Sequence, residues 1–247
     1  MERKIRVAAV SYLNTKPLIY GFEQGMMKDE IELVFDYPAN VARMLVNDEV
    51  DIGLIPVAAI PLLKEYHIIS DYCIGANFEV ASVCLFSEVP LDKIEKILLD
   101  YQSRTSVALL KILLKYHWKK RPEFLTARMG YEKEITGTTA GLVIGDRALK
   151  QRIRSPYIYD LASSWREMTG LPFVFAVWVS NKKLPDEFIE SFDAATAIGM
   201  QHIDEIVKTN VFNFYNLETY YRQNISYLLD DRKREGLELF LKFLANG

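Results

Sequence analysis

The feature that most constrains the fold of this chain is a regular alternation of short apolar segments with helical segments. Ile5–Val10 is a run of β-branched and small apolar residues typical of a buried strand, and residues 31–37 and 51–56 have the same character. Helical patterns are expected at residues 40–47 and 57–66, with a further helix directly after the first strand. Parallel strands need such crossover connections over the face of a sheet, so the alternation predicts an α/β protein.

A second unit of the same kind follows. Residues 95–100, 123–127 and 140–145 are expected strands, and a helix is expected from Ser103 to about Tyr116. When this unit is shifted back by about 90 residues, its strands fall on those of the first unit. The repeat is weak, because short apolar strands resemble one another. It predicts two similar α/β units.

Two strand-like segments are expected to cross between the units. Residues 79–88 and 171–180 contain apolar runs that lead into polar turns with proline, and after Pro185 the chain is expected to be helical to its end. The predicted organisation is a first lobe of residues 1–88 plus 176–247, an inserted second lobe of 89–175, and hinge strands near 80–88 and 172–180.

Composition excludes several classes of protein. Of the 247 residues, 50% are hydrophobic and 26% are charged, which is a globular and not a disordered composition. Lys and Arg total 30 against 33 Asp and Glu, and the resulting net charge of -3 gives no field that would hold a polyanion. Nucleic acid is therefore not expected as a partner. No stretch reaches the ~20 apolar residues of a membrane span, so no membrane partner is expected either.

Cysteine use and the first residues predict a cytoplasmic protein. Cys73 and Cys84 lie in apolar segments, and their spacing does not suit a metal site. A structural disulfide between them is the less favoured interpretation. The apolar run at residues 5–10 is too short for the core of a signal peptide and has no cleavage pattern. We therefore expect a reducing, cytoplasmic location.

Polar residues collect where the expected parallel strands end. Ligands of such sheets lie at the carboxyl ends of the strands, against helix N-termini whose free N–H groups favour anions. In Ser103–Ser106 the guanidinium of Arg104 favours a carboxylate ligand, although plain helix capping explains the hydroxyls equally well. The strand ends together hold residues 11–14, Ile55, Pro56, residues 103–106, Asp146 and Arg147.

The inventory of catalytic residues is thin. His67, His117 and His202 are expected in helices or at a helix end, where surface or packing roles are favoured over catalysis. Asp51 is interpreted as the polar start of a strand. The sequence contains no zinc, nucleotide-phosphate or nucleophile-elbow motif, so neither a metal nor a cofactor is expected. The residues alone do not separate ligand binding from catalysis.

Residues 10–18, with the sequence VSYLNTKPL, resemble the N-terminal signature of the chorismate dehydratases of the futalosine route to menaquinone. Residues 51–56, 82–87, 99–107 and 169–176 fit the same family in the same order. The resemblance implies a two-lobe periplasmic-binding-protein type II fold, with each lobe a mainly parallel sheet flanked by helices. It also implies a lyase that removes water from chorismate, a small dicarboxylate, to give 3-[(1-carboxyvinyl)oxy]benzoate without a cofactor.

On that resemblance the site residues are assigned by hypothesis. Asn14 and Ser11 are expected to be catalytic and to orient the substrate ring and its hydroxyl. Hydroxyl groups at positions 103–106 are expected to hold a carboxylate, whereas the proton acceptor and the formation of a homodimer are left open. The expected substrate-binding residues are Tyr12, Ile55, Pro56, Ser82, Ser103, Arg104, Thr105, Ser106 and Asp146.

Two other classes of function remain as alternatives. The first is a solute-binding protein for a small carboxylate that carries out no reaction, and the expected lack of an export signal argues against it. The second is a ligand-sensing regulatory domain, which is disfavoured because the sequence shows no basic face or helix pair for binding DNA. One fold serves many functions, so the fold alone does not choose among them.

Overall fold

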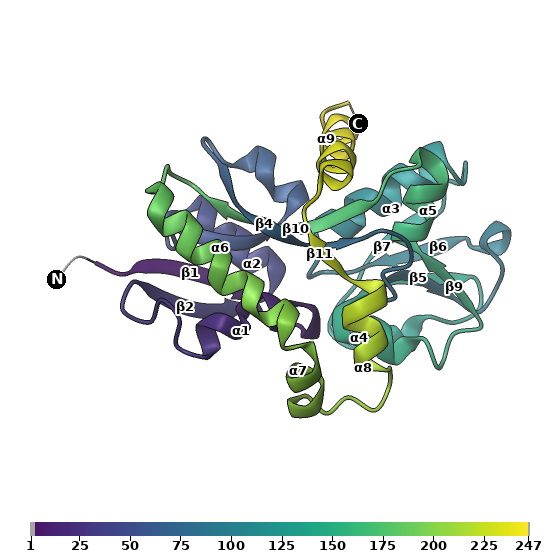
Figure 1. Cartoon of the computed structure of the whole chain (residues 1–247). Helices are drawn as coiled ribbons and strands as arrows, with labels where there is room; N and C mark the ends of the chain where they lie inside the picture. The colour runs from purple at the N-terminus through teal and green to yellow at the C-terminus, as the bar shows by residue number, and fades with distance from the viewer. Residues whose placement is uncertain (1–2, 247) are drawn as a thin grey trace.

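The computed structural model describes residues 3–246 and contains two β-sheets that lie side by side with helices around them (Figure 1). The first sheet has the order β11-β4-β10-β3-β1-β2 and the second the order β7-β6-β8-β5-β9. The strands of the first sheet are β1 (Ile5–Val10), β2 (Ile31–Asp36), β3 (Ile52–Pro56), β4 (His67–Ala76), β10 (Phe173–Ser180) and β11 (Ser226–Leu228). Those of the second are β5 (Val83–Ser87), β6 (Lys96–Leu99), β7 (Glu123–Thr126), β8 (Thr139–Ile144) and β9 (Tyr157–Asp160).

The internal repeat seen in the sequence is confirmed by strand pairing. In the first sheet β1 pairs in parallel with β2 and β3, and in the second sheet β6 pairs in parallel with β7 and β8. Even the register agrees, because Ala8 lies opposite Gly53 while Leu98 lies opposite Gly141. The two sheets therefore share a three-stranded parallel unit whose carboxyl ends carry equivalent loops and helix starts.

The two-lobe α/β architecture is confirmed, but the sheets are mixed and not mainly parallel. Strand β10 runs antiparallel to both β3 and β4, and β5 runs antiparallel to both β8 and β9. Strands β4, β9 and β11 were not expected from the sequence, and β11 interrupts the part of the chain after Pro185 that was expected to be helical. The helix expected at 57–66 is a short 3-10 helix, η2 (Val57–Leu62), because the chain turns at Leu63 toward β4.

Sheet membership differs from the expected division of the chain at both crossings. The strand expected near 80–88 is β5, which belongs to the second sheet, whereas the strand expected near 172–180 is β10, which belongs to the first. The expected boundaries assigned residues 83–87 to the first lobe and residues 173–175 to the second, whereas their strands belong to the opposite sheets. The expectation was wrong because an apolar run predicts a strand but not the strands with which it pairs. The chain crosses at residues 77–82 and through α5 (Leu161–Thr169). The lobe boundaries elsewhere remain a prediction.

Asp160 ties the two crossings together. Its Oδ1 accepts hydrogen bonds from the backbone N–H groups of Ala162 and Ser163, both at 3.0 Å, and so caps α5, which ends at Gly170 as the sequence predicts. Its Oδ2 accepts bonds from the N–H groups of Val80 and Ala81 at 3.1 and 2.8 Å. Burial raises the pKa of Asp160 to about 6 although these backbone bonds favour the charged form.

Helices cover both sheets and place the C-terminal part of the chain. Helix α6 packs along α1, and α9 lies against β10 and beside Trp165, which is fully buried against Phe173 and Phe240. No helix within residues 3–246 is both long and apolar enough to cross a membrane. The helices not yet given are η1 (Leu13–Thr15), α1 (Lys16–Glu23), α2 (Pro38–Val46), η3 (Leu91–Lys93), α3 (Thr105–Tyr116), η4 (Tyr131–Glu134), α4 (Gly145–Gln151), α6 (Asp186–Gln201), α7 (Ile203–Thr209), α8 (Leu217–Thr219), η5 (Tyr220–Asn224) and α9 (Asp231–Ala245).

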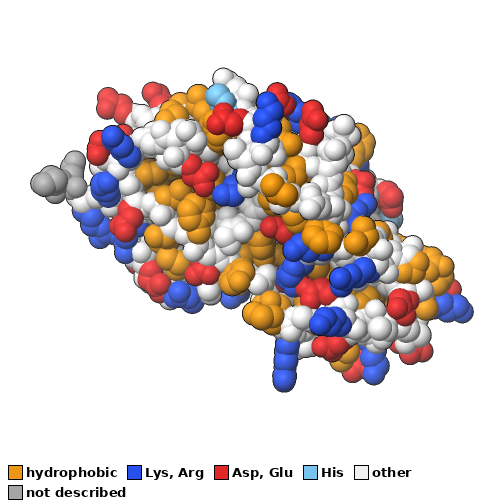
Figure 2. Space-filling model, turned by 90° about the horizontal axis from the view of Figure 1, so that it is seen from below, with side chains coloured by type: hydrophobic (Ala, Val, Ile, Leu, Met, Phe, Trp, Pro, Cys, Tyr) orange, Lys and Arg blue, Asp and Glu red, His pale blue; other side chains and the backbone are white. Residues whose placement is uncertain are grey.

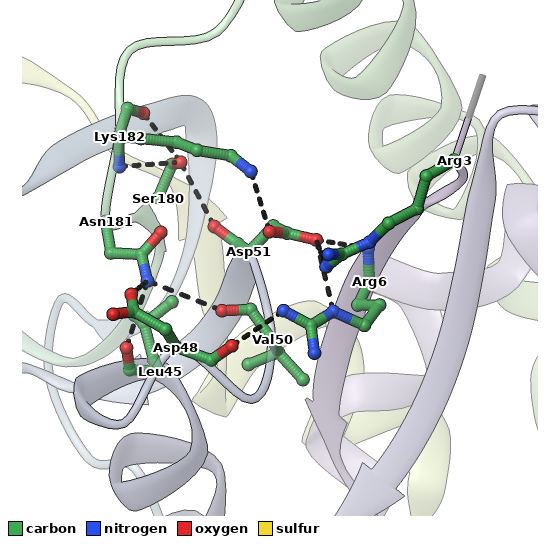
Figure 3. A network of polar contacts seen from close by, with 9 residues as sticks. All are labelled: Arg3, Arg6, Leu45, Asp48, Val50, Asp51, Ser180, Asn181 and Lys182. Atoms are coloured by element: carbon green, nitrogen blue, oxygen red, sulfur yellow. Dashed lines mark hydrogen bonds and ion pairs between the residues drawn. The ribbon is translucent and has the colours of Figure 1, made fainter.

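At the amino end of β3, Asp51 is the centre of a polar network (Figure 3). Its carboxylate accepts hydrogen bonds from Lys182 Nζ at 2.7 Å, from the Arg6 backbone N–H at 2.9 Å and from Arg3 Nη2 at 3.3 Å. Burial alone would raise the pKa of Asp51, but the bonds from Lys182 and Arg6 lower it to about 2. The network fastens β1, β3 and the end of β10 at the edge of the sheet opposite the carboxyl end of β3.

Candidate functional site

A cavity lies between the two sheets, at the carboxyl ends of β1, β3 and β8. The first residues of α2, α3 and α4 also reach it, so three helix N-termini converge there. This is the place where open α/β sheets bind ligands, and the sequence predicts it. The residues that line it are Val10, Tyr12, Asn14, Pro38, Pro56, Ile74, Val80, Val83, Ser103, Thr105, Ser106, Ile144, Gly145, Phe175 and Ala176.

The turn after β1 brings Tyr12 and Asn14 to the cavity. Tyr12 precedes the short helix η1, and Asn14 lies within it with only 8% of its surface exposed. The backbone carbonyl of Asn14 accepts a hydrogen bond from the hydroxyl of Tyr227 at 3.1 Å. Helix α1 begins directly after Thr15, with Pro17 in its first turn and without a side-chain hydrogen bond from Thr15 to its first N–H groups. The turn is therefore held by backbone contacts, and the residue at position 14 lines the cavity.

The start of α3 supplies the hydroxyl groups that the sequence predicts. Ser103 Oγ accepts a hydrogen bond from the Ser106 N–H at 3.0 Å, and Thr105 Oγ1 accepts one from the Ala58 N–H at 3.1 Å. Helix capping is thus part of the role of Ser103. A hydroxyl that accepts a bond still has its own proton to donate, so capping and anion binding are compatible. The helix N-terminus adds a partial positive charge at the same place.

Five of the predicted site residues, Asp146 among them, do not line the cavity. Ile55 is in the core of the first sheet, and Ser82 is fully buried with its Oγ bonded at 2.8 Å to the hydroxyl of Tyr220. Ser11 and Arg104 are exposed, with Arg104 turned to the outer face of α3. The pattern of residues at a strand end identifies the loop, but it does not fix which side chains of the loop turn inward.

Asp146 and Tyr12 join the two sides of the cavity. Asp146 does not line it, and its Oδ1 accepts a hydrogen bond from the Leu13 N–H at 3.2 Å. Burial raises the pKa of Asp146. The hydroxyl of Tyr12 donates to Gln102 Oε1 at 2.6 Å, and burial, with the nearby charge of Asp100, raises the pKa of Tyr12. Bonds from the turn after β1 therefore connect the two sides of the cavity.

The apolar part of the lining was largely missed from the sequence. Pro38 is the first residue of α2 and Gly145 the first of α4, and the rule that ligands bind at strand ends could have identified both. Ile74 and Phe175 come from β4 and β10, two antiparallel strands of the first sheet, so the rule for the ends of parallel strands does not point to them.

The cavity is favourable to an anion without containing a basic side chain. Within residues 3–246, neither lysine nor arginine lines it, and the three histidines also lie elsewhere. Charges of both signs are interspersed on the face of the molecule that Figure 2 shows. In the same part of the chain no group of three or more His, Cys, Asp or Glu residues is placed to hold a metal ion. The groups at the cavity that carry partial positive charge are therefore backbone N–H groups at helix starts and the protons of hydroxyls.

The fold and the cavity define a two-lobe α/β protein of the periplasmic-binding-protein type with a site for a small ligand between its lobes. A Candida albicans protein described as having the generic periplasmic binding protein fold matches 98% of this chain and 95% of its own, with a TM-score of 0.63 and 14% sequence identity. At this identity the similarity shows the fold alone.

The chain belongs to the menaquinone biosynthesis family, whose model matches residues 5–246. It is 27% identical to a chorismate dehydratase of Thermus thermophilus, over 95% of this chain and 93% of that protein. It is 26% identical to a chorismate dehydratase of Campylobacter jejuni, over 94% of this chain and 89% of that protein. The family named from the resemblance of residues 10–18 is thereby confirmed.

Proposed function

We propose that this protein is a chorismate dehydratase, which removes one water from chorismate to give 3-[(1-carboxyvinyl)oxy]benzoate in the cytoplasmic biosynthesis of menaquinone. Family membership over residues 5–246 and two chorismate dehydratases among its relatives support the reaction. The observation that carries the proposal is the cavity itself, where Asn14 faces the hydroxyl-rich N-terminus of α3. A concave site between two lobes suits a small dicarboxylate better than a polymer.

The reaction requires charge stabilisation more than it requires a reactive side chain. A proton leaves the ring carbon that bears the ether, hydroxide leaves the neighbouring carbon, and the electrons of the C–H bond complete the aromatic ring. Negative charge spreads onto the ring carboxylate while the proton leaves. Thr105, Ser106 and the N-terminus of α3 would hold that carboxylate and stabilise the developing charge, which is commonly a large contribution to catalysis.

Asn14 and Tyr12 are placed to orient the substrate. Both come from the turn after β1 and line the same cavity as the start of α3, so a ring held by its carboxylate at α3 would have its hydroxyl within reach of this turn. Phe175 and Pro56 supply apolar surface for the ring. Ser82 lies behind the lining, so contact with a substrate would require its hydroxyl to exchange the bond to Tyr220. Ser11 and Arg104 are not part of this proposal because both are exposed.

The proton would be taken by water or by a carboxylate of the substrate. Tyr12 is the one titratable side chain among the lining residues that the structure describes, and its proton is engaged with Gln102. The carboxylate of Asp146 is bonded to the Leu13 N–H and lies outside the lining. A substrate that carries its own base explains how the lining can lack histidine, lysine and a carboxylate.

The direct test is to incubate the purified protein with chorismate and to follow the mixture by mass spectrometry. The expected result is loss of one water from chorismate at a rate proportional to protein concentration, with the absorbance of a benzoate appearing in parallel. Calorimetric titration with chorismate provides the second measurement. Binding of chorismate without any conversion would favour the alternative, a solute-binding protein for small carboxylates, over the enzyme.

A further inference from the structure

The ring of Tyr12 is held from the second sheet by a chain of polar contacts. Its hydroxyl donates to Gln102 Oε1 at 2.6 Å, and the same oxygen accepts a hydrogen bond from Arg147 Nη2 at 2.8 Å. The ring lies so close to the start of α4 that a Cβ atom at Gly145 would be 3.2 Å from it. Tyr12 thus belongs to the turn after β1 but packs against and bonds to the other side of the cavity.

Behind Gln102 stands a buried ion pair that fixes its position. Arg147 Nη2 lies 2.6 Å from Asp100 Oδ2, and the side chain of Asp100 is fully buried. The other oxygen of Asp100 accepts the Gln102 N–H at 2.8 Å, and Arg147 Nη1 lies 2.9 Å from Glu132 Oε1. The hydroxyl of Tyr131 also donates to Asp100, at 2.8 Å. The ion pair therefore holds both the backbone N–H of Gln102, through Asp100, and its side-chain Oε1, through Arg147.

A buried ion pair contributes little net stability, because removing two charges from water costs nearly as much as their attraction returns. A positional role explains such a pair better than a contribution to stability. Through Gln102 this pair holds Tyr12, a side chain that lines the cavity and comes from its opposite side. Arg147 and Asp100 themselves do not line the cavity.

We propose that Gln102 and Arg147 are positioning residues that hold Tyr12 across the cavity, and so keep the two sides closed around the substrate. The proposal rests on the proposed dehydratase function and adds residues that touch neither the substrate nor the reacting atoms. When the bond from Tyr12 to Gln102 is absent, a smaller fraction of the protein is closed. The apparent affinity for a ligand falls in proportion to that fraction.

The kinetic test is a double-mutant cycle of Tyr12→Phe and Gln102→Ala, measured with chorismate. Each single variant is expected to raise KM about fivefold to tenfold, the effect of losing one net hydrogen bond, with kcat changed less than about twofold. The double variant is expected to be no worse than either single variant, because all three lack the same bond. Gln102→Glu retains an acceptor for both Tyr12 and Arg147 and is expected to restore KM.

The matched control is Tyr20→Phe. This change also removes a tyrosine hydroxyl bonded at 2.6 Å, but to Glu205, which is on the same side of the cavity as Tyr20. It is expected to leave KM unchanged. Additive effects in the double variant, or an unchanged KM in Tyr12→Phe, would overturn the proposal.

A measurement without turnover separates this proposal from the dehydratase assignment. Spin labels on Val46→Cys, at the end of α2, and Met129→Cys, which precedes η4, report the distance between the two sides, because the native Cys73 and Cys84 are buried. In the ligand-free protein, Tyr12→Phe is expected to give a longer and broader distance distribution than the parent. Identical distributions would contradict the proposal even if chorismate is converted, whereas failure to convert chorismate would leave this result valid.

Discussion

At the scale of single residues, Asn14 carries the most weight in the proposed chemistry. It lines the cavity from η1, it is almost completely buried, and its backbone carbonyl is tied to Tyr227. The bond from Tyr227 does not depend on the amide group of Asn14, whose Oδ1 accepts only a long bond from Thr15 Oγ1 at 3.5 Å among the hydrogen bonds of the described residues. A substitution there should separate an effect on the reaction from an effect on folding.

Asn14→Ala is expected to lower kcat/KM for chorismate by about 100-fold, the size of effect found when one preorganised polar group is removed from an active site. The free energy of unfolding, measured with urea, should fall by only about 1 kcal/mol, because the bond from Tyr227 to the backbone remains. Asn40→Ala, at an exposed asparagine of α2, serves as the control and should retain full activity. Wild-type activity in Asn14→Ala would remove Asn14 from the site.

Asp51 allows a prediction about stability and pH. Its folded-state pKa of about 2 lies below the ordinary value, so its bonds stabilise the fold above pH ~4 and this contribution is lost as the pH falls from about 4 to about 2. Asp51→Asn should reduce the free energy of unfolding by about 2 kcal/mol at pH 7. Urea unfolding at pH 7 and pH 3 should show a smaller difference between the two proteins at pH 3. An equal difference at both pH values would contradict the assignment.

At the scale of elements, the packing of α6 on α1 depends on two glycines. A Cβ atom at Gly199 would lie 1.8 Å from the carbonyl oxygen of Pro17, and one at Gly21 would lie 2.2 Å from that of Ala195. The sequence predicts the buried face of α6, since Phe192, Ala195 and Gly199 recur at helical spacing and all are buried. The periodicity of α6 did not predict how closely its backbone approaches that of α1.

Gly199→Ala is expected to destabilise the protein by about 3 kcal/mol, because the helices must move apart. Helix propensity alone would predict a gain of about 1 kcal/mol for the same change, so the two effects have opposite signs. Thermal unfolding of Gly199→Ala and of the exposed control Ala194→Gly distinguishes them. If Gly199→Ala is more stable than wild type, the close packing described for α1 and α6 is wrong.

Elements with a clear period or an apolar run were predictable from the sequence, and their partners were not. Strands β1, β3 and β10 were recognised as apolar runs, and α3 from its stripe and hydroxyl-rich start. Strand β4 was missed because Ser70 and Asp71 interrupt its apolar pattern, and β9 because it has only four residues. Antiparallel pairing to β10 and β5 depends on contacts distant in sequence, which no local pattern contains.

For the candidate site, the sequence predicted the loops that form it but not the directions of all their side chains. Asn14, Ser103, Thr105 and Ser106 were identified because polar residues at a strand end and a helix start have a physical reason to meet a ligand. Whether a loop residue turns inward depends on the dihedral angles of the loop, and Arg104 turns outward for that reason. The support from Gln102, Arg147 and Asp100 was not predictable because it is made by contacts across the cavity and within the second sheet.

At the scale of the whole molecule, two repeated units bring their strand ends together at the cavity between them. The net charge of -3 does not oppose an anionic substrate, because helix N-termini and hydroxyls supply a positive field at the site alone. The contacts of Tyr12 and Asp146 join the two sides of the cavity. In the proposed function the relative position of the two sheets then matters for catalysis.

The measurement that tests the central claim most directly is the time course of chorismate conversion by wild type and by Ala176→Leu. Ala176 lines the cavity, so leucine there fills part of the space that the substrate needs. We predict conversion to 3-[(1-carboxyvinyl)oxy]benzoate by wild type, and a rate at least about 100-fold lower for the folded Ala176→Leu variant, since a misplaced substrate loses that order of rate. Ala194→Leu, on the exposed face of α6, should convert chorismate at the wild-type rate. No conversion by wild type, or equal rates for wild type and Ala176→Leu, would contradict the account.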